Sequence, residues 1–294
     1  MIRQAAAAGR QTSATFASRP GPALPCPASD GVVWRPLDIR DPARVAAVIA
    51  DVAPSAVITA SSGADWAVTA DGAVRVALAA AEQGCRLVHV FSDAVFSGAR
   101  VRYDERCLPD PLTPYGAAKA AAETAVRLLM PAAAVARTSL IAGHGRSVHE
   151  RTVHALADGT RDTVLFTDDI RCPVHVDDLA AALWEIALSG AAGMFHLAGP
   201  DALGRHDPGV LIARRDGLDG ARLPAGRRAG SSRTRGRGRA VREQPPALSC
   251  PRPRGRHRRP GRAARLKAAC VPDVRPTGRT GPGSHRRHGS RVKR

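Results

Sequence analysis

The sequence has few aromatic residues, no paired cysteines and no long apolar segment. Phe, Trp and Tyr together make up 3% of the 294 residues. The six cysteines are scattered without a C-x-x-C pair, which is typical of reduced thiols in a cytosolic protein and argues against a disulfide framework or a zinc site. No apolar run reaches the roughly 18–20 residues of a membrane span, and the start lacks a secretory signal pattern. We therefore expect a cytoplasmic protein with no membrane partner and no metal ligands.

Charge is divided unevenly along the chain. Residues 220–294 contain 23 basic and two acidic residues and no aromatic residue, whereas residues 1–219 have a net charge of −3. This predicts a folded domain in residues 1–219 and a disordered Arg/Pro/Gly-rich tail in residues 220–294. The abrupt change in composition favours a frameshifted terminus over an evolved basic arm. An evolved arm would bind nucleic acid through its phosphates, without sequence preference.

Apolar periodicity alternates between short strands and amphipathic helices over residues 1–200. Such alternation indicates βαβ units around a parallel sheet, and it predicts an α/β fold with a Rossmann-like, doubly wound sheet. Strands are expected at residues 11–17, 32–37, 55–60, 86–91, 132–137 and 194–198. Helices are expected at residues 69–83, 114–129, 148–157 and 176–188, and Asp41 and Pro42 form a helix start with an acidic cap.

A Gly-rich phosphate-binding turn is missing from the first part of the sequence. A dinucleotide-binding sheet opens with a strand, a Gly-rich turn and a helix whose N-terminus holds the pyrophosphate. Residues 1–9 are Ala-rich and end in Gly, as a helix end does, and no G-x-G-x-x-G precedes the second expected strand. We expect the first strand of the sheet to be missing, which would leave two inner strand edges without partners. The alternative is that residues 1–9 are a frayed leader and that the fold differs.

Tyr115 and Lys119 carry the sharpest chemical signal. They lie four residues apart in an expected helix, so their side chains share one face about 5–6 Å apart. A nearby ammonium favours the ionised phenol, and a phenol so tuned exchanges protons with a carbonyl or alcohol near neutral pH. The alternative is a surface tyrosine beside a solvated lysine. Ser92 ends an apolar strand, where ligands of parallel sheets bind, and can donate a hydrogen bond to the same carbonyl.

Several linked motifs resemble one enzyme family. They are residues 92–98 (SDAVFSG), 103–105 (YDE), 111–123 (PLTPYGAAKAAAE), 137–139 (RTS) and 171–180 (RCPVHVDDLA). Together they are similar to the extended short-chain dehydrogenase/reductases, and within these to the dTDP-4-dehydrorhamnose reductase-like sugar-nucleotide reductases. The resemblance covers about residues 1–215 and implies a small substrate lobe formed by segments of about residues 139–215.

The resemblance implies a reduction of a keto sugar nucleotide by NAD(P)H, with a homodimer as one arrangement it allows. Tyr115 would act as general acid, Lys119 would orient the cofactor ribose, and Ser92 would polarise the keto group. Substrate contacts would fall on Asp93, Val95, Phe96, Ser139 and Arg171. Cofactor contacts would fall on Ser18, Arg19, Asp38, Ala60, Ser61, Ser62, Tyr115, Lys119, Arg137 and Thr138.

The cofactor preference follows from one residue. Arg19 comes just after the expected strand at residues 11–17, where NAD-specific sheets place an acidic residue for the ribose hydroxyls. An arginine there suits a 2′-phosphate and favours NADPH over NADH. An ordinary loop arginine is the alternative.

Two departures from the family pattern keep other functions open. The Gly-rich turn is absent, and Thr69 stands where relatives often carry an active-site Asn. One alternative is a catalytically impaired binding module of the same fold, like the regulatory subunit of methionine adenosyltransferase. Another is a nucleic-acid binder acting through the basic tail, although the tail has no aromatic residues for base stacking.

Overall fold

A four-stranded parallel sheet forms the centre of the computed structural model, which describes residues 1–17, 32–61, 63, 65–100 and 102–228. The strand order is β10-β5-β4-β3, and every neighbouring pair runs parallel. The bounds of these strands are Ala56–Thr59 for β3, Arg86–Ser92 for β4, Ala134–Thr138 for β5 and Gly193–Leu197 for β10. All four were expected from the sequence, within two residues at each end. The predicted α/β fold is confirmed.

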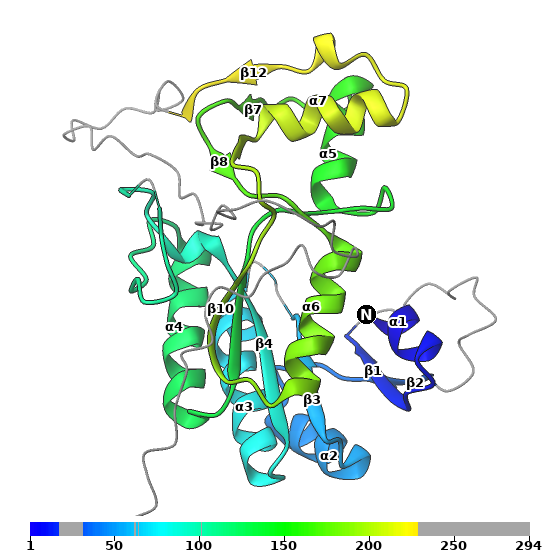
Figure 1. The fold of residues 1–294 in the computed structure, drawn as a ribbon, viewed down its shortest axis with the longest axis vertical. Helices are drawn as coiled ribbons and strands as arrows, with labels where there is room; N and C mark the ends of the chain where they lie inside the picture. Colours follow the sequence, from blue (N-terminus) through cyan, green and yellow to red (C-terminus); the bar gives the residue numbers. More distant parts are fainter. Residues whose placement is uncertain (18–31, 62, 64, 101, 229–294) are drawn as a thin grey trace, which may run out of the picture.

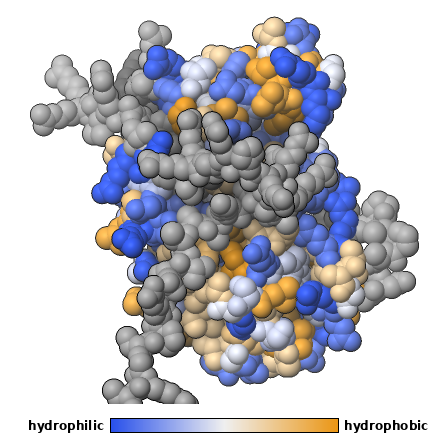
Figure 2. Space-filling view, in the orientation of Figure 1, coloured by the Kyte–Doolittle hydropathy of each residue, from blue (hydrophilic) through white to orange (hydrophobic). Residues whose placement is uncertain are grey.

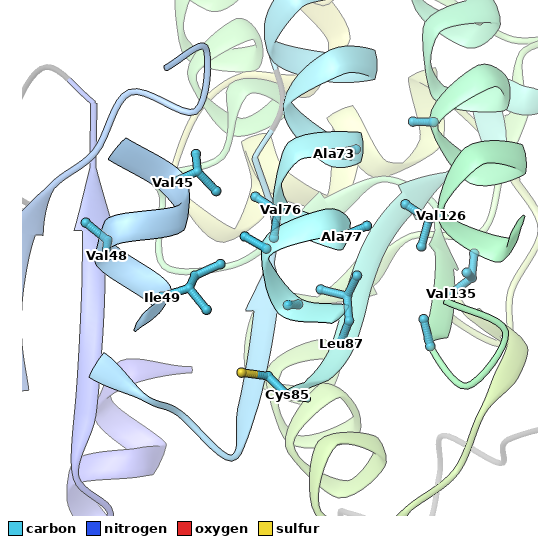
Figure 3. Close-up of a cluster of buried hydrophobic side chains, with 14 of the residues drawn as sticks. Val45, Val48, Ile49, Ala73, Val76, Ala77, Cys85, Leu87, Val126 and Val135 are labelled. Atoms are coloured by element: carbon cyan, nitrogen blue, oxygen red, sulfur yellow. The ribbon is translucent and has the colours of Figure 1, made fainter. Parts of the chain in front are cut away.

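Helices cover both faces of this sheet (Figure 1). Apolar side chains of α2, α3 and α4 pack with β4 and β5 into one core, whereas α6 packs on the opposite face. Figure 3 shows the first core, in which Leu87 of β4 points toward Val76 and Ala77. The bounds are Pro42–Val52 for α2, Gly72–Glu82 for α3, Pro114–Leu129 for α4 and Val176–Ser189 for α6.

One expected helix starts differently from its prediction. A π-helical turn, η2, spans Ala67–Asp71 and leads directly into α3, whereas the periodicity placed the helix start at Thr69. The Thr69 hydroxyl is turned back onto Gly63, donating to its carbonyl at 2.8 Å and accepting from its amide at 3.1 Å. Arg75 donates to the Ala67 carbonyl at 3.1 Å. These side-chain hydrogen bonds help to stabilise the π-helical turn. Hydrophobic periodicity does not report such bonds, so the sequence did not predict the turn.

The first two strands form a sheet of their own. Strands β1 (Thr12–Phe16) and β2 (Val32–Pro36) pair in parallel beside the short helix α1 (Ile2–Ala7). Within the described residues, no strand joins β1 to β3. Instead, α1 is tied to α6: Gln4 donates to the Asp177 carbonyl at 2.9 Å, and Trp184 donates to the Met1 carbonyl at 3.1 Å. In the described residues, β1 and β3 therefore belong to separate sheets, and the missing first strand stays a prediction.

A smaller lobe sits above the carboxyl ends of the central strands (Figure 1). Figure 2 shows hydrophilic residues interspersed with hydrophobic ones on the visible face of this lobe. Helices α5 (Val148–Ala157) and α7 (His206–Arg215) pack on each other around an apolar core. Its remaining elements are short: η3 (Asp93–Val95) and β6 (Ile141–Ala142) at its base, then β7 (Leu165–Phe166), β8 (Ile170–Arg171), β9 (Val174–His175), β11 (Leu203–Gly204), η4 (Gly220–Arg222) and β12 (Ala225–Gly226). Two-residue strands are too short for periodicity to reveal, so the sequence did not predict them.

The folded structure continues past residue 219, where the domain was expected to end. Strand β12 pairs with β7, and the Leu223 side chain is buried against Ile212 and Val153. This apolar packing extends the lobe to at least Arg228 and corrects the expected boundary. Residues 229–294, which hold most of the predicted basic tail, lie outside the described part of the chain.

No described helix combines the length and the hydropathy needed to cross a bilayer.

Candidate active site

The N-terminus of α4 brings Tyr115 to the end of β4. The Thr113 hydroxyl caps this helix by accepting from the Gly116 amide at 3.0 Å, and Pro114 occupies the first helical position. A Cβ atom on Gly116 would lie 2.2 Å from the Ala94 carbonyl oxygen. Glycine at this position therefore lets α4 approach η3, the turn that follows Ser92.

Tyr115 and Ser92 line the same cleft, with a volume of about 870 Å³, between the sheet and the smaller lobe. Five residues of the sequence-predicted site line it: Ser92, Asp93, Tyr115, Ser139 and Arg171. The cleft also carries six arginines against two aspartates, an excess of positive charge that suits an anionic ligand.

Lys119 lies beneath this cleft, on the same helix as Tyr115. It is 2% exposed, and its ammonium lies 6.0 Å from the centre of the Tyr115 ring. The Nζ atom donates long hydrogen bonds to the carbonyls of Ser61 at 3.4 Å and Val90 at 3.5 Å. Burial lowers the pKa of Lys119 to about 8. Because its hydrogen bonds to these two carbonyls are long, the Lys119 ammonium is suited to donate a further hydrogen bond to a hydroxyl group.

Ser92 and Asp93 have different roles at the end of β4. The Ser92 hydroxyl accepts from the Ala94 amide at 3.2 Å and so caps η3. Asp93 is buried, pairs with Arg171 at 2.9 Å and accepts from the Ser139 hydroxyl at 2.7 Å. Asp93 therefore fixes Ser139 and Arg171 at the cleft wall.

Sequence reasoning missed the ion network behind Arg171. Asp169, which is 1% exposed, pairs with both Arg171 and Arg205 at 2.8 Å. Burial by itself would lower the pKa of Arg171, but the ion pairs with Asp93 and Asp169 outweigh it and raise that pKa above its ordinary value. Arg205 belongs to no motif recognised in the sequence. Its place next to Asp169 is therefore evident only from the fold.

His149 on α5 is a second cleft residue that the sequence did not single out. Burial, followed by the charges of Arg205 and Arg171, lowers its pKa to about 4. His149 is therefore neutral at physiological pH, which leaves the positive charge of the cleft to the arginines.

Arg137, a predicted cofactor residue, has a buried side chain. Its guanidinium is 1% exposed, forms a bidentate ion pair with Glu123 at 2.6 and 2.8 Å, and donates to the Cys107 carbonyl at 3.2 Å. It also stacks on the Phe96 ring at 4.8 Å. These partners hold the guanidinium inside the core, and the contact of Arg137 with a cofactor stays a prediction.

Val95 and Phe96, predicted to contact a substrate, are buried. Both lie in a small core with Tyr103, whose ring stacks on Phe96 at 4.1 Å between centroids. Neither residue lines the cleft. Apolar burial, which the sequence pattern alone cannot distinguish from binding, holds them in the core, and their contact with a substrate stays a prediction.

The remaining predicted cofactor residues lie in different parts of the fold or outside the described residues. Asp38 is on the surface in an ion pair with Arg40 at 2.6 Å, and the hydrogen bond from Arg40 lowers its pKa to about 2. Ala60 and Ser61 follow β3, and Thr138 ends β5 with its hydroxyl buried and without a hydrogen-bond partner in the described structure. Three further residues, Ser18, Arg19 and Ser62, fall outside the described residues.

Comparison with known proteins identifies the family. The model of the RmlD substrate binding domain matches residues 1–241. The chain belongs to this family. A dTDP-4-dehydrorhamnose reductase from Sinorhizobium fredii is 32% identical over 181 residues, covering 55% of this chain and 61% of the relative. A spore coat polysaccharide biosynthesis protein of Bacillus subtilis is 31% identical over 153 residues, covering 52% of this chain and 54% of the relative.

A solved structure shares the fold of this RmlD-family chain. The dTDP-4-dehydrorhamnose reductase of Bacillus anthracis, determined in complex with NADP, superposes with a TM-score of 0.58 at 23% identity, over 66% of this chain and 73% of that one. The two curated relatives are matched over little more than half of their own length. The family match also runs past residue 215, where the resemblance was expected to end.

Proposed function

We propose that this chain is an NADPH-dependent reductase of a keto sugar nucleotide, with a dTDP-linked 4-keto sugar as its substrate class. Support comes from the names of its reductase relatives and from the bound NADP of the similar solved structure. The observation that carries the proposal is that Tyr115 and Ser92 line one cleft and that the buried ammonium of Lys119 lies 6.0 Å from the Tyr115 ring centre.

The residues around Lys119 fit the nicotinamide end of a dinucleotide. Lys119 Nζ has only long bonds to Ser61 and Val90, and the buried Thr138 hydroxyl has no partner in the described structure. Both groups are available to ribose hydroxyls or to the nicotinamide amide. The cofactor, when bound, would supply the hydride.

Two side chains would act on the carbonyl of the substrate. The Tyr115 phenol would give its proton to the carbonyl oxygen as that oxygen gains negative charge, and the Ser92 hydroxyl would donate a hydrogen bond to the same oxygen. Lys119 would stabilise the resulting phenolate through its positive charge. Arg171, held by Asp93 and Asp169, would bind the anionic part of the sugar nucleotide.

The alternative of a non-catalytic binding module is less well supported, since Tyr115 and Ser92 line one cleft and the Lys119 ammonium lies 6.0 Å from the Tyr115 ring centre. A nucleic-acid-binding role would depend on residues 229–294, outside the described structure.

Replacing Tyr115 by Phe tests the proposal. The change removes only the phenol hydroxyl, so we expect turnover of a dTDP-linked 4-keto sugar to fall by about 10²–10⁴-fold while NADPH affinity stays nearly the same. Turnover is measured by NADPH oxidation and affinity by NADPH fluorescence.

Tyr103 provides a matched control, because it is the other tyrosine of the chain and is buried away from the cleft. Tyr103→Phe removes the same hydroxyl from a position outside the cleft and should retain turnover. Full activity in Tyr115→Phe, or equal loss in both variants, would exclude Tyr115 as the acid.

A further inference from the structure

Two histidines and an aspartate meet at the mouth of the cleft, where α6 begins. His144 Nε2 lies 2.8 Å from Asp177 Oδ2, and His175 Nδ1 lies 4.0 Å from the same oxygen. One nitrogen from each histidine and one carboxylate oxygen all lie within 4.8 Å of one another. The three side chains are partly solvent-exposed, so a dissolved ion can reach them.

The backbone around His144 is arranged to bring the two imidazoles together. His144 itself has a φ of 59°, a left-handed conformation that is uncommon for a residue other than glycine. A Cβ atom on the preceding Gly143 would lie 2.7 Å from His175 Nε2, so glycine is needed for this approach. The two rings meet edge to face with centroids 5.3 Å apart. Strain held at a residue of this kind points to a functional role of its side chain.

We propose that His144, His175 and Asp177 form a binding site for a divalent transition-metal ion of the Zn²⁺ type. Ligands at Zn–N and Zn–O distances of roughly 2.0–2.2 Å around a tetrahedral ion lie about 3.3 Å apart. The observed separations of 2.8 and 4.0 Å bracket this value, and one nitrogen of each histidine lies within 4.8 Å of the other. To bind through Nδ1, His175 must release the Asp177 amide, which donates to that atom at 3.3 Å. Two imidazoles and one carboxylate select Zn²⁺ over Mg²⁺ or Ca²⁺, which prefer oxygen ligands.

Arg3 of α1 competes with an ion for the same atoms. Its Nη2 atom lies 3.1 Å from His144 Nε2 and 3.7 Å from Asp177 Oδ1. Because this arginine is half exposed, its side chain can turn into solvent when an ion binds. The site thus exchanges an ion pair with Arg3 for a metal ion, and removal of Arg3 should strengthen metal binding.

Titration of the full-length chain with Zn²⁺, against a chromophoric chelator, tests the site. His144→Asn removes one ligand while keeping a residue that tolerates positive φ. His175→Asn removes another and keeps an acceptor for the start of α6. We expect each change to weaken Zn²⁺ binding at this site by at least about tenfold and Arg3→Ala to tighten it, with no competition from Mg²⁺.

His154 provides the matched control, because it pairs with Asp216 at 2.7 Å and belongs to no group of three metal-binding side chains in the described residues. His154→Asn should leave the number of bound ions and their affinity unchanged. All variants keep the remaining histidines and cysteines, so any difference reports on the proposed site. Equal Zn²⁺ binding in the wild type, His144→Asn and His175→Asn, or no binding to the wild type, would overturn the proposal.

Discussion

Lys119 combines a buried position with a charge that the proposed reaction needs. Its carbonyl contacts with Ser61 and Val90 are long, and burial lowers its pKa from 10.5 to about 8. Above pH 8 the side chain loses its proton in the folded protein, and the positive charge beneath Tyr115 disappears. The proposed reductase activity should therefore decline as pH rises through about 8.

The same residue makes stability depend on pH, and the direction can be tested. The pKa of Lys119 is lower in the folded state, so between about 8 and 10.5 the unfolded chain binds more protons and stability rises with pH. Lys119→Met should remove this rise. Urea unfolding at about pH 7 and about pH 10 measures it. The other two lysines lie in residues 229–294, so a difference between the wild type and Lys119→Met reports on Lys119. The same pH dependence of stability in both would contradict a lowered pKa of Lys119.

At the scale of elements, a buried ion pair joins α4 to β5. Glu123 is fully buried, and its carboxylate accepts two hydrogen bonds from Arg137 in a bidentate ion pair. Arg137 also donates to the Cys107 carbonyl. The sequence motif that ends in Glu123 was interpreted as part of a catalytic pattern, but the glutamate is structural here. By fixing α4 against β5, it holds the helix that carries Tyr115.

Removing Glu123 should therefore be costly. Glu123→Ala leaves the Arg137 charge buried without its carboxylate, and we expect a loss of about 3–5 kcal/mol in the free energy of unfolding. Asp51→Ala serves as the control, because Asp51 pairs with Arg35 at 2.5 Å on the surface. An exposed pair contributes at most about 1 kcal/mol. Urea unfolding distinguishes the two, and similar losses would refute the structural role of Glu123.

At the scale of the whole molecule, the break between the two sheets bears on cofactor binding. Lys119 and Thr138, proposed for the nicotinamide end, lie at the central sheet, whereas Arg19, expected at the 2′-phosphate, comes in sequence after β1 of the other sheet. Both ends of the cofactor should then contribute to its affinity.

Reduced nicotinamide mononucleotide, which lacks the adenine half, tests this expectation. It should bind at least about tenfold more weakly than NADPH, since it lacks the 2′-phosphate that Arg19 is expected to bind. Isothermal titration of both compounds against the full chain gives the comparison. Equal binding of the two compounds would show that the adenine half gains little from the protein.

The sequence by itself determined the α/β fold and most of the central elements. Apolar periodicity is a local property, so α4 and α5 were predicted at their exact bounds and the strands of the main sheet within two residues. The helical spacing of Tyr115 and Lys119 and the strand end at Ser92 are equally local. Of these residues, Tyr115 and Ser92 line one cleft, and Lys119 is buried close to the Tyr115 ring.

Only the tertiary structure decided which neighbours these residues have. Burial assigns Arg137, Val95 and Phe96 to the core, although their motif suggested a binding role. Long-range packing brings Arg205 to Asp169, and His144 to His175 and Asp177. Such contacts depend on how distant segments meet in space, and neither periodicity nor motif spacing in one sequence contains that information.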